Sequence, residues 1–175
     1  MVVGLTGAAS AQWYFDGKAA GDVDFAKSDG EFRAALLLTN DLKAFSKAWK
    51  KPKDPVQLHG SNRAYRGKPM EAIVIFSNCQ AGPDELCDAT VDFVVFRPDE
   101  SIYGKIEDTE LWRGKPPPVK NAIQVGVQTL GVTIEPADPD GKYRVETTVR
   151  DRVRGATLRL TQPFWVGTEP HDSER

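Results

Sequence analysis

Short apolar segments separated by turn-forming residues dominate the sequence from residue 55 onward. Several of these segments place apolar side chains at every second position, which is typical of strands that bury one face. Strands are predicted at residues 31–39, 56–59, 70–77, 89–96, 101–105, 122–129, 132–135, 142–150 and 156–166. Because no helical patterns alternate with these strands, the sequence favours a sandwich or barrel over a parallel sheet with crossover helices.

One short helix is predicted at residues 41–51. Its apolar side chains recur at helical spacing, at Leu42, Phe45 and Trp49. Asn40 or Asp41 can cap its first turn, and Pro52 ends it. We expect Trp49 to anchor this helix to the predicted sandwich.

The last two predicted strands have the clearest alternation. In the first of them the residues on one face are Tyr143, Val145, Thr147 and Val149. In the second, Leu158 and Leu160 point inward, and Pro163 marks a bulge or an edge because it lacks a backbone N–H.

In the segment 134–166, a corner that contains Asp138, Gly141 and Tyr143 leads into these two strands. It resembles the closing strands of bacterial immunoglobulin-like and fibronectin-like modules. In such a corner the tyrosine ring packs in the core while its hydroxyl bonds a nearby backbone group. The resemblance implies an all-β fold, an immunoglobulin-like antiparallel β-sandwich with one short helix inserted near residues 41–51.

Cys79 and Cys87 are the two cysteines of the chain, on either side of the turn signal Gly82-Pro83-Asp84. We interpret them as a disulfide that clamps a β-hairpin formed by the flanking strands, because facing Cα atoms of such strands lie within disulfide range. Two unrelated reduced thiols are the alternative. The spacing fits neither a zinc site nor a C-x-x-C redox pair. A stable disulfide implies an oxidising compartment.

The first eleven residues end in Ala9-Ser10-Ala11, a pattern that precedes signal-peptidase cleavage, although no basic residue precedes the short apolar part. Together with the cysteines this pattern predicts a periplasmic or secreted protein. The predicted organisation is a signal-peptide remnant, a loosely ordered start, one sandwich domain and a polar tail, at residues 1–11, 12–30, 31–167 and 168–175. No apolar run approaches the length of a spanning helix.

Residues that could carry chemistry do not form a known motif. The sequence lacks nucleophile-elbow, phosphate-loop, zinc-protease and dinucleotide-binding patterns, and no cofactor or metal is predicted. His59 and His171 are the two histidines, and a structural role is favoured for His59. Calcium binding is one interpretation of the carboxylates of Glu135, Asp138 and Asp140, because clustered loop oxygens are typical calcium ligands. A simple turn is the favoured interpretation of this segment.

The basic residues cluster between residues 41 and 70, a segment with eight basic and two acidic residues. This segment carries a net charge of +6 in a chain whose net charge is −2 and whose pI is near 5.7. The residues proposed as a patch for an anionic partner are Lys43, Lys47, Lys50, Lys51, Arg63 and Arg66. A solvated helix face followed by a solvated loop is the simpler interpretation and is favoured. The overall charge gives no reason to expect nucleic-acid binding.

These features predict a non-catalytic exported module that binds an unknown protein or an anionic component of the cell envelope. A small β-sandwich hydrolase or carbohydrate-active enzyme is the first alternative, because a pair of catalytic carboxylates cannot be selected without distances. A metal-handling envelope protein is the second alternative.

Overall fold

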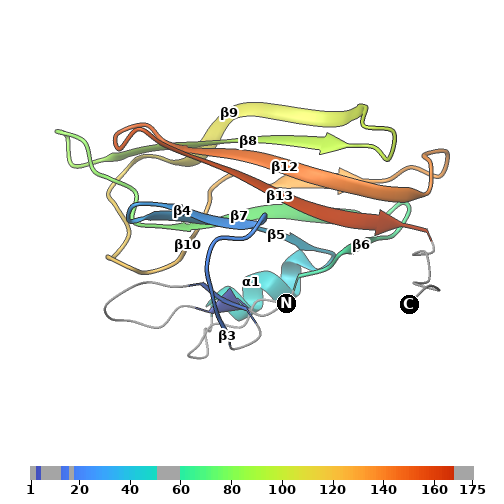
Figure 1. Ribbon diagram of the computed structural model, residues 1–175, viewed down its shortest axis with the longest axis horizontal. Helices are drawn as coiled ribbons and strands as arrows, with labels where there is room; N and C mark the ends of the chain where they lie inside the picture. Colours follow the sequence, from blue (N-terminus) through green and yellow to red (C-terminus); the bar gives the residue numbers. More distant parts are fainter. Residues whose placement is uncertain (1–2, 5–12, 16–17, 51–59, 168–175) are drawn as a thin grey trace.

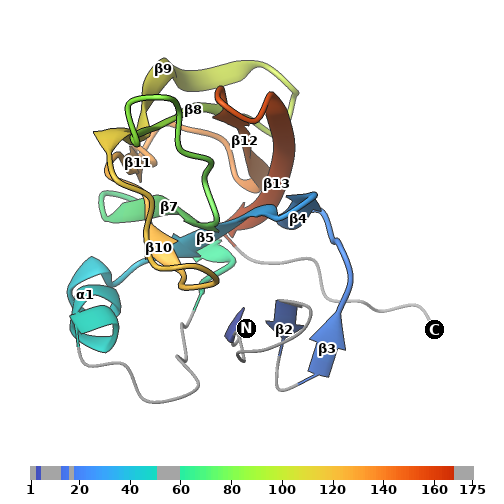
Figure 2. The ribbon, with the colours of Figure 1, turned by 90° about the vertical axis from the view of Figure 1, so that its left-hand side faces the viewer.

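The computed structural model describes residues 3–4, 13–15, 18–50 and 60–167. Two β-sheets pack face to face, and one helix lies against the outer face of one sheet (Figures 1 and 2). The fold is therefore an all-β sandwich with a short helix, as the sequence predicts.

The first sheet is named here the β5–β7 sheet, after its two central strands. Its strands are β4 (Ala26–Asp29), β5 (Phe32–Thr39), β7 (Pro69–Ser77), β10 (Gln124–Val125) and β11 (Leu130–Thr133). The order is β10-β7-β5-β4, and β11 also pairs with β7. Side chains on both faces of β5 and β7 are buried. This burial explains why their sequences read as nearly continuous apolar runs rather than as alternating patterns.

The second sheet is named the β12–β13 sheet. Its strands are β6 (Arg63–Ala64), β8 (Cys87–Phe96), β9 (Ile102–Lys115), β12 (Gly141–Asp151) and β13 (Ala156–Val166). The order is β6-β13-β12-β8-β9; β6 runs parallel to β13 and the other pairs are antiparallel. The predicted alternation is confirmed, because the inward residues of β12 and β13 are buried. Three further short strands, β1 (Val3–Gly4), β2 (Trp13–Phe15) and β3 (Lys18–Ala20), form a small antiparallel sheet.

Two apolar clusters hold the layers together. The larger one fills the space between the two sheets, with Phe32, Phe76, Phe93, Tyr143 and Phe164 as its largest aromatic side chains. The smaller one lies on the outer face of the β5–β7 sheet, beneath α1 (Leu42–Lys50). The β5–β7 sheet is thus the middle layer of three, covered by the second sheet on one side and by the helix on the other.

The predicted hairpin between the strands that flank the cysteines is wrong. β7 lies in the first sheet and β8 in the second, and the two strands do not pair with each other. The connection between them is long enough to cross the roughly 10 Å between packed sheets. Asn78, with a φ of 59°, turns the chain as it leaves β7.

The strand predicted at 101–105 is longer, and the one predicted at 122–129 is shorter. β9 continues to Lys115, whereas β10 ends at Val125. The chain then crosses between the sheets, because the Gly126 amide donates to the Val74 carbonyl of β7 and the Val127 amide donates to the Leu111 carbonyl of β9. This crossing joins one edge of each sheet.

Pro163 does not cause a bulge in the pairing of β12 with β13, which runs without a register shift from Gly141 to Asp151. The amides of Thr161 and Trp165 donate away from β12, to the Asp24 and Asn62 carbonyls. The missing N–H of Pro163 therefore faces the same outer edge, between these two contacts, where no ladder bond is lost.

Some predictions fall outside the described residues: the strand at 56–59, the cleavage point after Ala11 and the tail at 168–175. Within the start predicted as loosely ordered, 12–30, β4 pairs with β5 and Ala26 is fully buried.

Candidate binding surface

A row of three lysines runs along the solvent side of α1. Lys43, Lys47 and Lys50 are all exposed. At 100° per residue their positions fall within a stripe of about 60°, and the row spans about 10 Å along the helix axis. Within the described residues none of the three forms an ion pair. We call these three side chains the lysine row.

Local sequence fixes the start of the helix that carries the row. The Asp41 carboxylate accepts a hydrogen bond from the Ala44 amide at 2.7 Å, so Asp41 is the N-cap. Asn40 instead donates its side-chain amide to the Ser61 hydroxyl and to the Arg63 carbonyl. This contact ties the chain before the helix to the segment that leads into β6.

The opposite side of α1 packs on the β5–β7 sheet. Phe45 is 8% exposed and lies against the apolar cluster of that sheet. Trp49 stacks on Phe45 with ring centroids 6.3 Å apart, and it contacts the same cluster, which confirms its predicted role as an anchor. Burial of Phe45 contributes about 2 kcal/mol by its apolar area. The helix therefore has a fixed orientation, with its lysines directed outward.

The structure does not bring the six predicted patch residues together. Lys51 lies outside the described residues. Arg66 pairs with Asp140 and donates to the Glu135 carbonyl, and Arg63 donates to the Gly167 carbonyl. Arg63 thus links β6 to the residue that follows β13, and Arg66 links the chain after β6 to the segment between β11 and β12. The three lysines of the row form no ion pair with any other residue that the structure describes.

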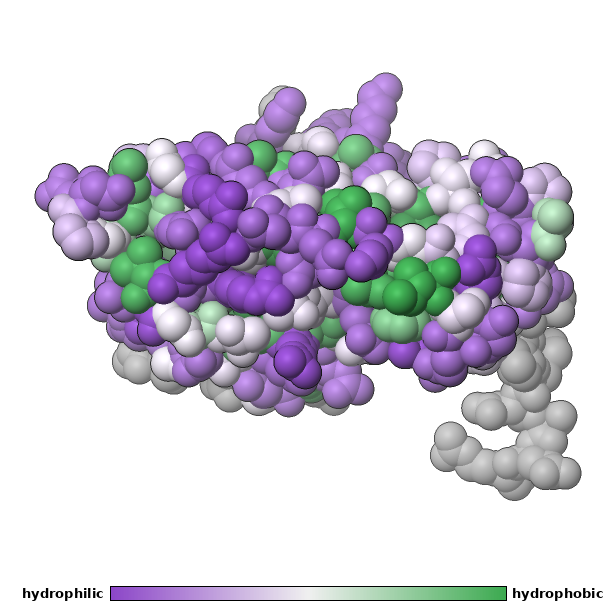
Figure 3. All heavy atoms as spheres, turned by 90° about the horizontal axis from the view of Figure 1, so that it is seen from above, coloured by the Kyte–Doolittle hydropathy of each residue, from purple (hydrophilic) through white to green (hydrophobic). Residues whose placement is uncertain are grey.

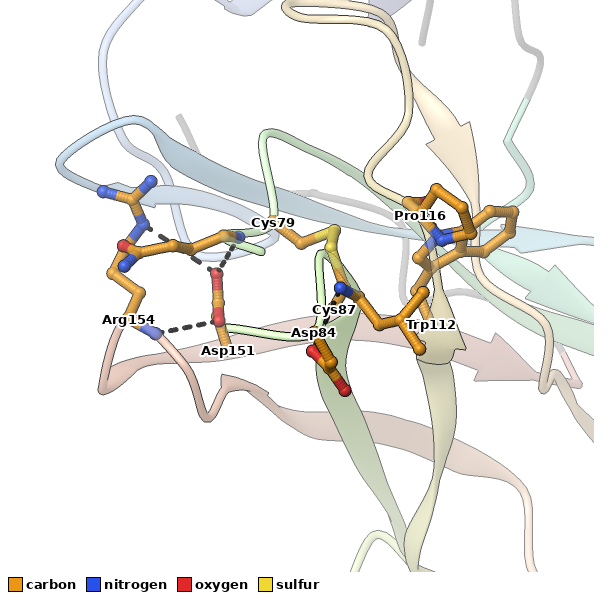
Figure 4. Close-up of a disulfide and its surroundings, with 9 residues drawn as sticks. Cys79, Asp84, Cys87, Trp112, Pro116, Asp151 and Arg154 are labelled. Atoms are coloured by element: carbon orange, nitrogen blue, oxygen red, sulfur yellow. Dashed lines mark hydrogen bonds and ion pairs between the residues drawn. A yellow bond between two sulfur atoms is a disulfide. The ribbon is translucent and has the colours of Figure 1, made fainter. Parts of the chain in front are cut away.

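The disulfide between Cys79 and Cys87 is present, with Cα atoms 6.1 Å apart (Figure 4). It joins the end of β7 to the start of β8, and so links the two sheets at one end of the sandwich. Both cysteines are at least 95% buried.

A shallow hollow of about 550 Å³ lies beside the disulfide loop. Its lining is mainly apolar and includes Pro83, Leu86 and Val153. Two of its charged groups bind each other, because the Arg113 guanidinium contacts the Asp88 carboxylate at 3.0 Å. Sequence reasoning missed this hollow, since its walls come from the disulfide loop with the start of β8, the end of β9 and the turn after β12, which are distant in the chain.

The predicted tyrosine corner residues occupy the opposite end of the sandwich. Tyr143 is fully buried, stacks on Phe164 and donates its hydroxyl to the Pro139 carbonyl at 2.8 Å. Gly141 has a φ of 138°, and a Cβ there would lie 2.9 Å from Pro98. The Asp138 carboxylate accepts a hydrogen bond from the Glu135 amide at 2.8 Å.

Tyr103 closes this corner from β9. Its hydroxyl lies 2.6 Å from Asp138 Oδ2 and 2.7 Å from the Thr133 carbonyl oxygen, so two acceptors share its single proton. Burial, followed by the contact with Asp138, raises the pKa of Tyr103 to about 12. The same hydroxyl, with the Glu135 amide, lowers the pKa of Asp138. The calcium hypothesis is not supported here, because the Asp138 carboxylate accepts a hydrogen bond within the turn and the Asp140 carboxylate pairs with Arg66.

The outer face of the β12–β13 sheet is strongly hydrophilic, with a few separate apolar patches (Figure 3). Its charges form ion pairs. Arg150 binds Asp92 at 2.7 Å, Arg152 binds Asp108, and Arg144 contacts both Glu100 and Glu146. Burial acts to raise the pKa of Asp92, but the hydrogen bonds from Arg150 and from the Asp108 amide outweigh it, so that this pKa is lowered. Hydrogen-bonded partners also lower the pKa values of Asp99 and Glu110. This face is electrostatically balanced, in contrast to the lysine row.

Among the described residues, no group of three or more side chains of the usual metal-ligating kinds is gathered in one place. No helix in this part of the chain has the length and apolar character that crossing a bilayer requires.

Neither a protein-family model nor a curated protein matches the sequence. Among solved structures, a family 123 glycoside hydrolase from Clostridium perfringens is similar over 78% of this chain, with 9% identity and a TM-score of 0.45. This chain spans 27% of that hydrolase chain. The CARDB domain of a Pyrococcus furiosus protein, solved with di-metal ions, is similar over 85% of this chain and 99% of its own, with 14% identity and a TM-score of 0.38. At these values the similarities assign neither a family nor an activity.

Proposed function

We propose that this chain is a periplasmic or secreted binding module that holds an anionic partner against the lysine row. The observation that carries the proposal is the arrangement of Lys43, Lys47 and Lys50 on one exposed side of α1, without ion pairs among the described residues. Like charges held this close repel one another, and an anionic partner relieves that repulsion.

The rest of the molecule supports a binding role. The sandwich gives α1 a rigid base through Phe45 and Trp49, so the lysines meet a partner without a large loss of backbone entropy. The disulfide supports an extracytoplasmic location, because such bonds persist in oxidising compartments. Mass spectrometry after thiol alkylation of cell fractions tests the location. Reduced cysteines in a cytoplasmic fraction would contradict it.

Binding of the full chain to soluble polyanions, heparin and polyglutamate, tests the surface. The triple variant K43E/K47E/K50E reverses the lysine row. The control variant K68E/K120E/K142E reverses three exposed lysines elsewhere and changes the net charge equally. We expect salt-sensitive binding by the native chain and by the control, and its loss in the row variant. Equal binding by all three proteins would overturn the proposed surface.

A further inference from the structure

We propose that the lysine row is an adsorption surface for anionic phospholipid headgroups, so that the sandwich lies against a membrane with α1 toward the lipid. This inference rests on the proposed function and names the partner of the same surface. Three features of the row favour a lipid surface over an acidic protein: its shape, its residue type and the apolar side chain beside it.

The shape of the row suits an extended partner. The lysines project from a convex helix, and no hollow described in this structure is lined by any of them. A single small anion would therefore meet only one or two ammonium groups at a time. A plane of headgroups can contact all three lysines, because the stripe is about 10 Å long and lies on one side of the helix.

The residue type points the same way. Protein interfaces are enriched in arginine and depleted in lysine, since the planar guanidinium binds carboxylates in a fixed two-pronged geometry. Lysine ammonium groups act as hydrated point charges on flexible stems and require no matched geometry. Several arginines of this chain bind specific carboxylates, as Arg66 binds Asp140 and Arg150 binds Asp92. The three lysines of the row form no such pair among the described residues, and their ammonium groups are available to a negatively charged surface.

Leu42 adds an apolar contact at one end of the row. It is 41% exposed, although it lies on the side of α1 that carries the buried Phe45. A basic amphipathic helix is one of the sequence patterns found at membrane surfaces. Because Phe45 and Trp49 are held by the β5–β7 sheet, the helix cannot insert. The predicted association is shallow and reversible.

This orientation separates the two faces of the sandwich. α1 and the outer face of the β12–β13 sheet lie on opposite sides of the β5–β7 sheet (Figure 1). With α1 against the lipid, the balanced ion pairs around Asp108 and Arg144 face the aqueous phase. Those pairs gain nothing from a negative surface, so the charge distribution favours a single docking face.

Co-sedimentation of the full chain with vesicles tests the inference. The vesicles contain phosphatidylcholine alone or with about one-third phosphatidylglycerol, at low and at high salt. Each lysine near an anionic surface is worth about 1 kcal/mol, so K43E/K47E/K50E should lower the partition coefficient by at least about 100-fold. The control K68E/K120E/K142E should lower it by less than about tenfold. Leu42→Ala should weaken vesicle binding about threefold and leave heparin binding unchanged.

The soluble polyanions separate this inference from the proposed function. Binding to polyglutamate or heparin without binding to the anionic vesicles would overturn the lipid assignment and leave the lysine row as a site for another polyanion. If the native chain binds neither the soluble polyanions nor the anionic vesicles, both proposals are overturned. Vesicle binding that is equal with and without phosphatidylglycerol, or that survives in the row variant, would also overturn the lipid assignment. Unchanged vesicle binding by Leu42→Ala would overturn the apolar contact.

Discussion

The buried carboxylate of Asp151 accepts a hydrogen bond from the backbone amide of Gln80 at 2.8 Å. Asp151, which Figure 4 labels, ends β12. Gln80 directly follows the disulfide-bonded Cys79 in the sequence. The other carboxylate oxygen accepts from the Arg154 amide at 3.0 Å. One side chain thus holds both the disulfide loop and the turn between β12 and β13, and it does so while fully buried.

Removal of this carboxylate should destabilise the sandwich. In Asp151→Ala two partly buried backbone amides lose their buried acceptor, which should lower the free energy of unfolding by about 3 kcal/mol. Urea unfolding of the oxidised protein measures this change. Asp84→Ala is the matched control, because Asp84 also accepts a backbone amide, that of Leu86, but at an exposed position. We expect a loss below about 1 kcal/mol there. Equal losses in the two variants would contradict the role given to Asp151.

The disulfide should contribute about 2.5 kcal/mol to stability. Cys79 and Cys87 are eight residues apart, and closing a loop of this size restricts the unfolded chain by that amount in the chain-entropy model. The measurement compares urea midpoints with and without a reducing agent. The double variant Cys79→Ala/Cys87→Ala should be less stable than the native chain and should not respond to the reductant. A reductant effect of similar size in the double variant would show that the disulfide is not its cause.

The cysteine pair shows what sequence could and could not predict about the fold. Two β-rich segments around a Gly-Pro-Asp turn correctly indicated a disulfide between Cys79 and Cys87. They did not show that β7 and β8 enter different sheets, because a connection of this length can return beside its own strand or cross to the facing sheet. Hydrophobic alternation predicts which side chains face inward, and it did so for β12 and β13. Alternation alone does not predict which strands are neighbours.

Gly126 should not tolerate a side chain. It directly follows β10, where the backbone changes its hydrogen-bond partner from β7 to β9. A Cβ there would be 2.6 Å from Leu111 Cδ1 and 3.1 Å from the Val74 carbonyl oxygen. Gly126→Ala should therefore cost about 1–3 kcal/mol of unfolding free energy through overpacking. Gly104→Ala is the control within β9, because a Cβ at Gly104 meets nothing within 4 Å. If both variants unfold at the native midpoint, the edge of the sandwich is looser than this contact implies.

Tyr103 should make stability depend on pH in the alkaline range. Its pKa is raised from 10.0 to about 12, so the folded protein holds the proton more tightly than the unfolded chain. The stabilisation is fully present below pH 10 and is lost as the pH rises through about 12. Unfolding free energies at about pH 9 and about pH 11 measure the slope. Tyr103→Phe should be less stable at pH 9 by about 1 kcal/mol and should show a shallower decline. An identical decline in this variant would assign the effect to another group.

The candidate surface was only partly predictable, because the sequence does not show which distant segments become neighbours in the fold. The positions of Lys43, Lys47 and Lys50 follow directly from helical spacing, so the sequence was sufficient for the row. The neutralisation of Arg66 was not visible, because its partner Asp140 is 74 positions away in the chain. Ion pairs between distant loops depend on the packing of the whole sandwich. A count of charges along the sequence therefore overestimates the free positive charge of residues 41–70.

Asp41→Asn should strengthen polyanion binding without loss of stability. Asparagine caps a helix about as well as aspartate, so the bond to the Ala44 amide remains and the free energy of unfolding should change by less than about 0.5 kcal/mol. The negative charge beside the lysine row disappears, which should tighten binding to anionic vesicles about fivefold at low salt. Glu107→Gln removes the same charge from the opposite face, where Glu107 pairs with Lys105. If both variants bind more tightly to the same extent, net charge governs adsorption and the row has no special part in it.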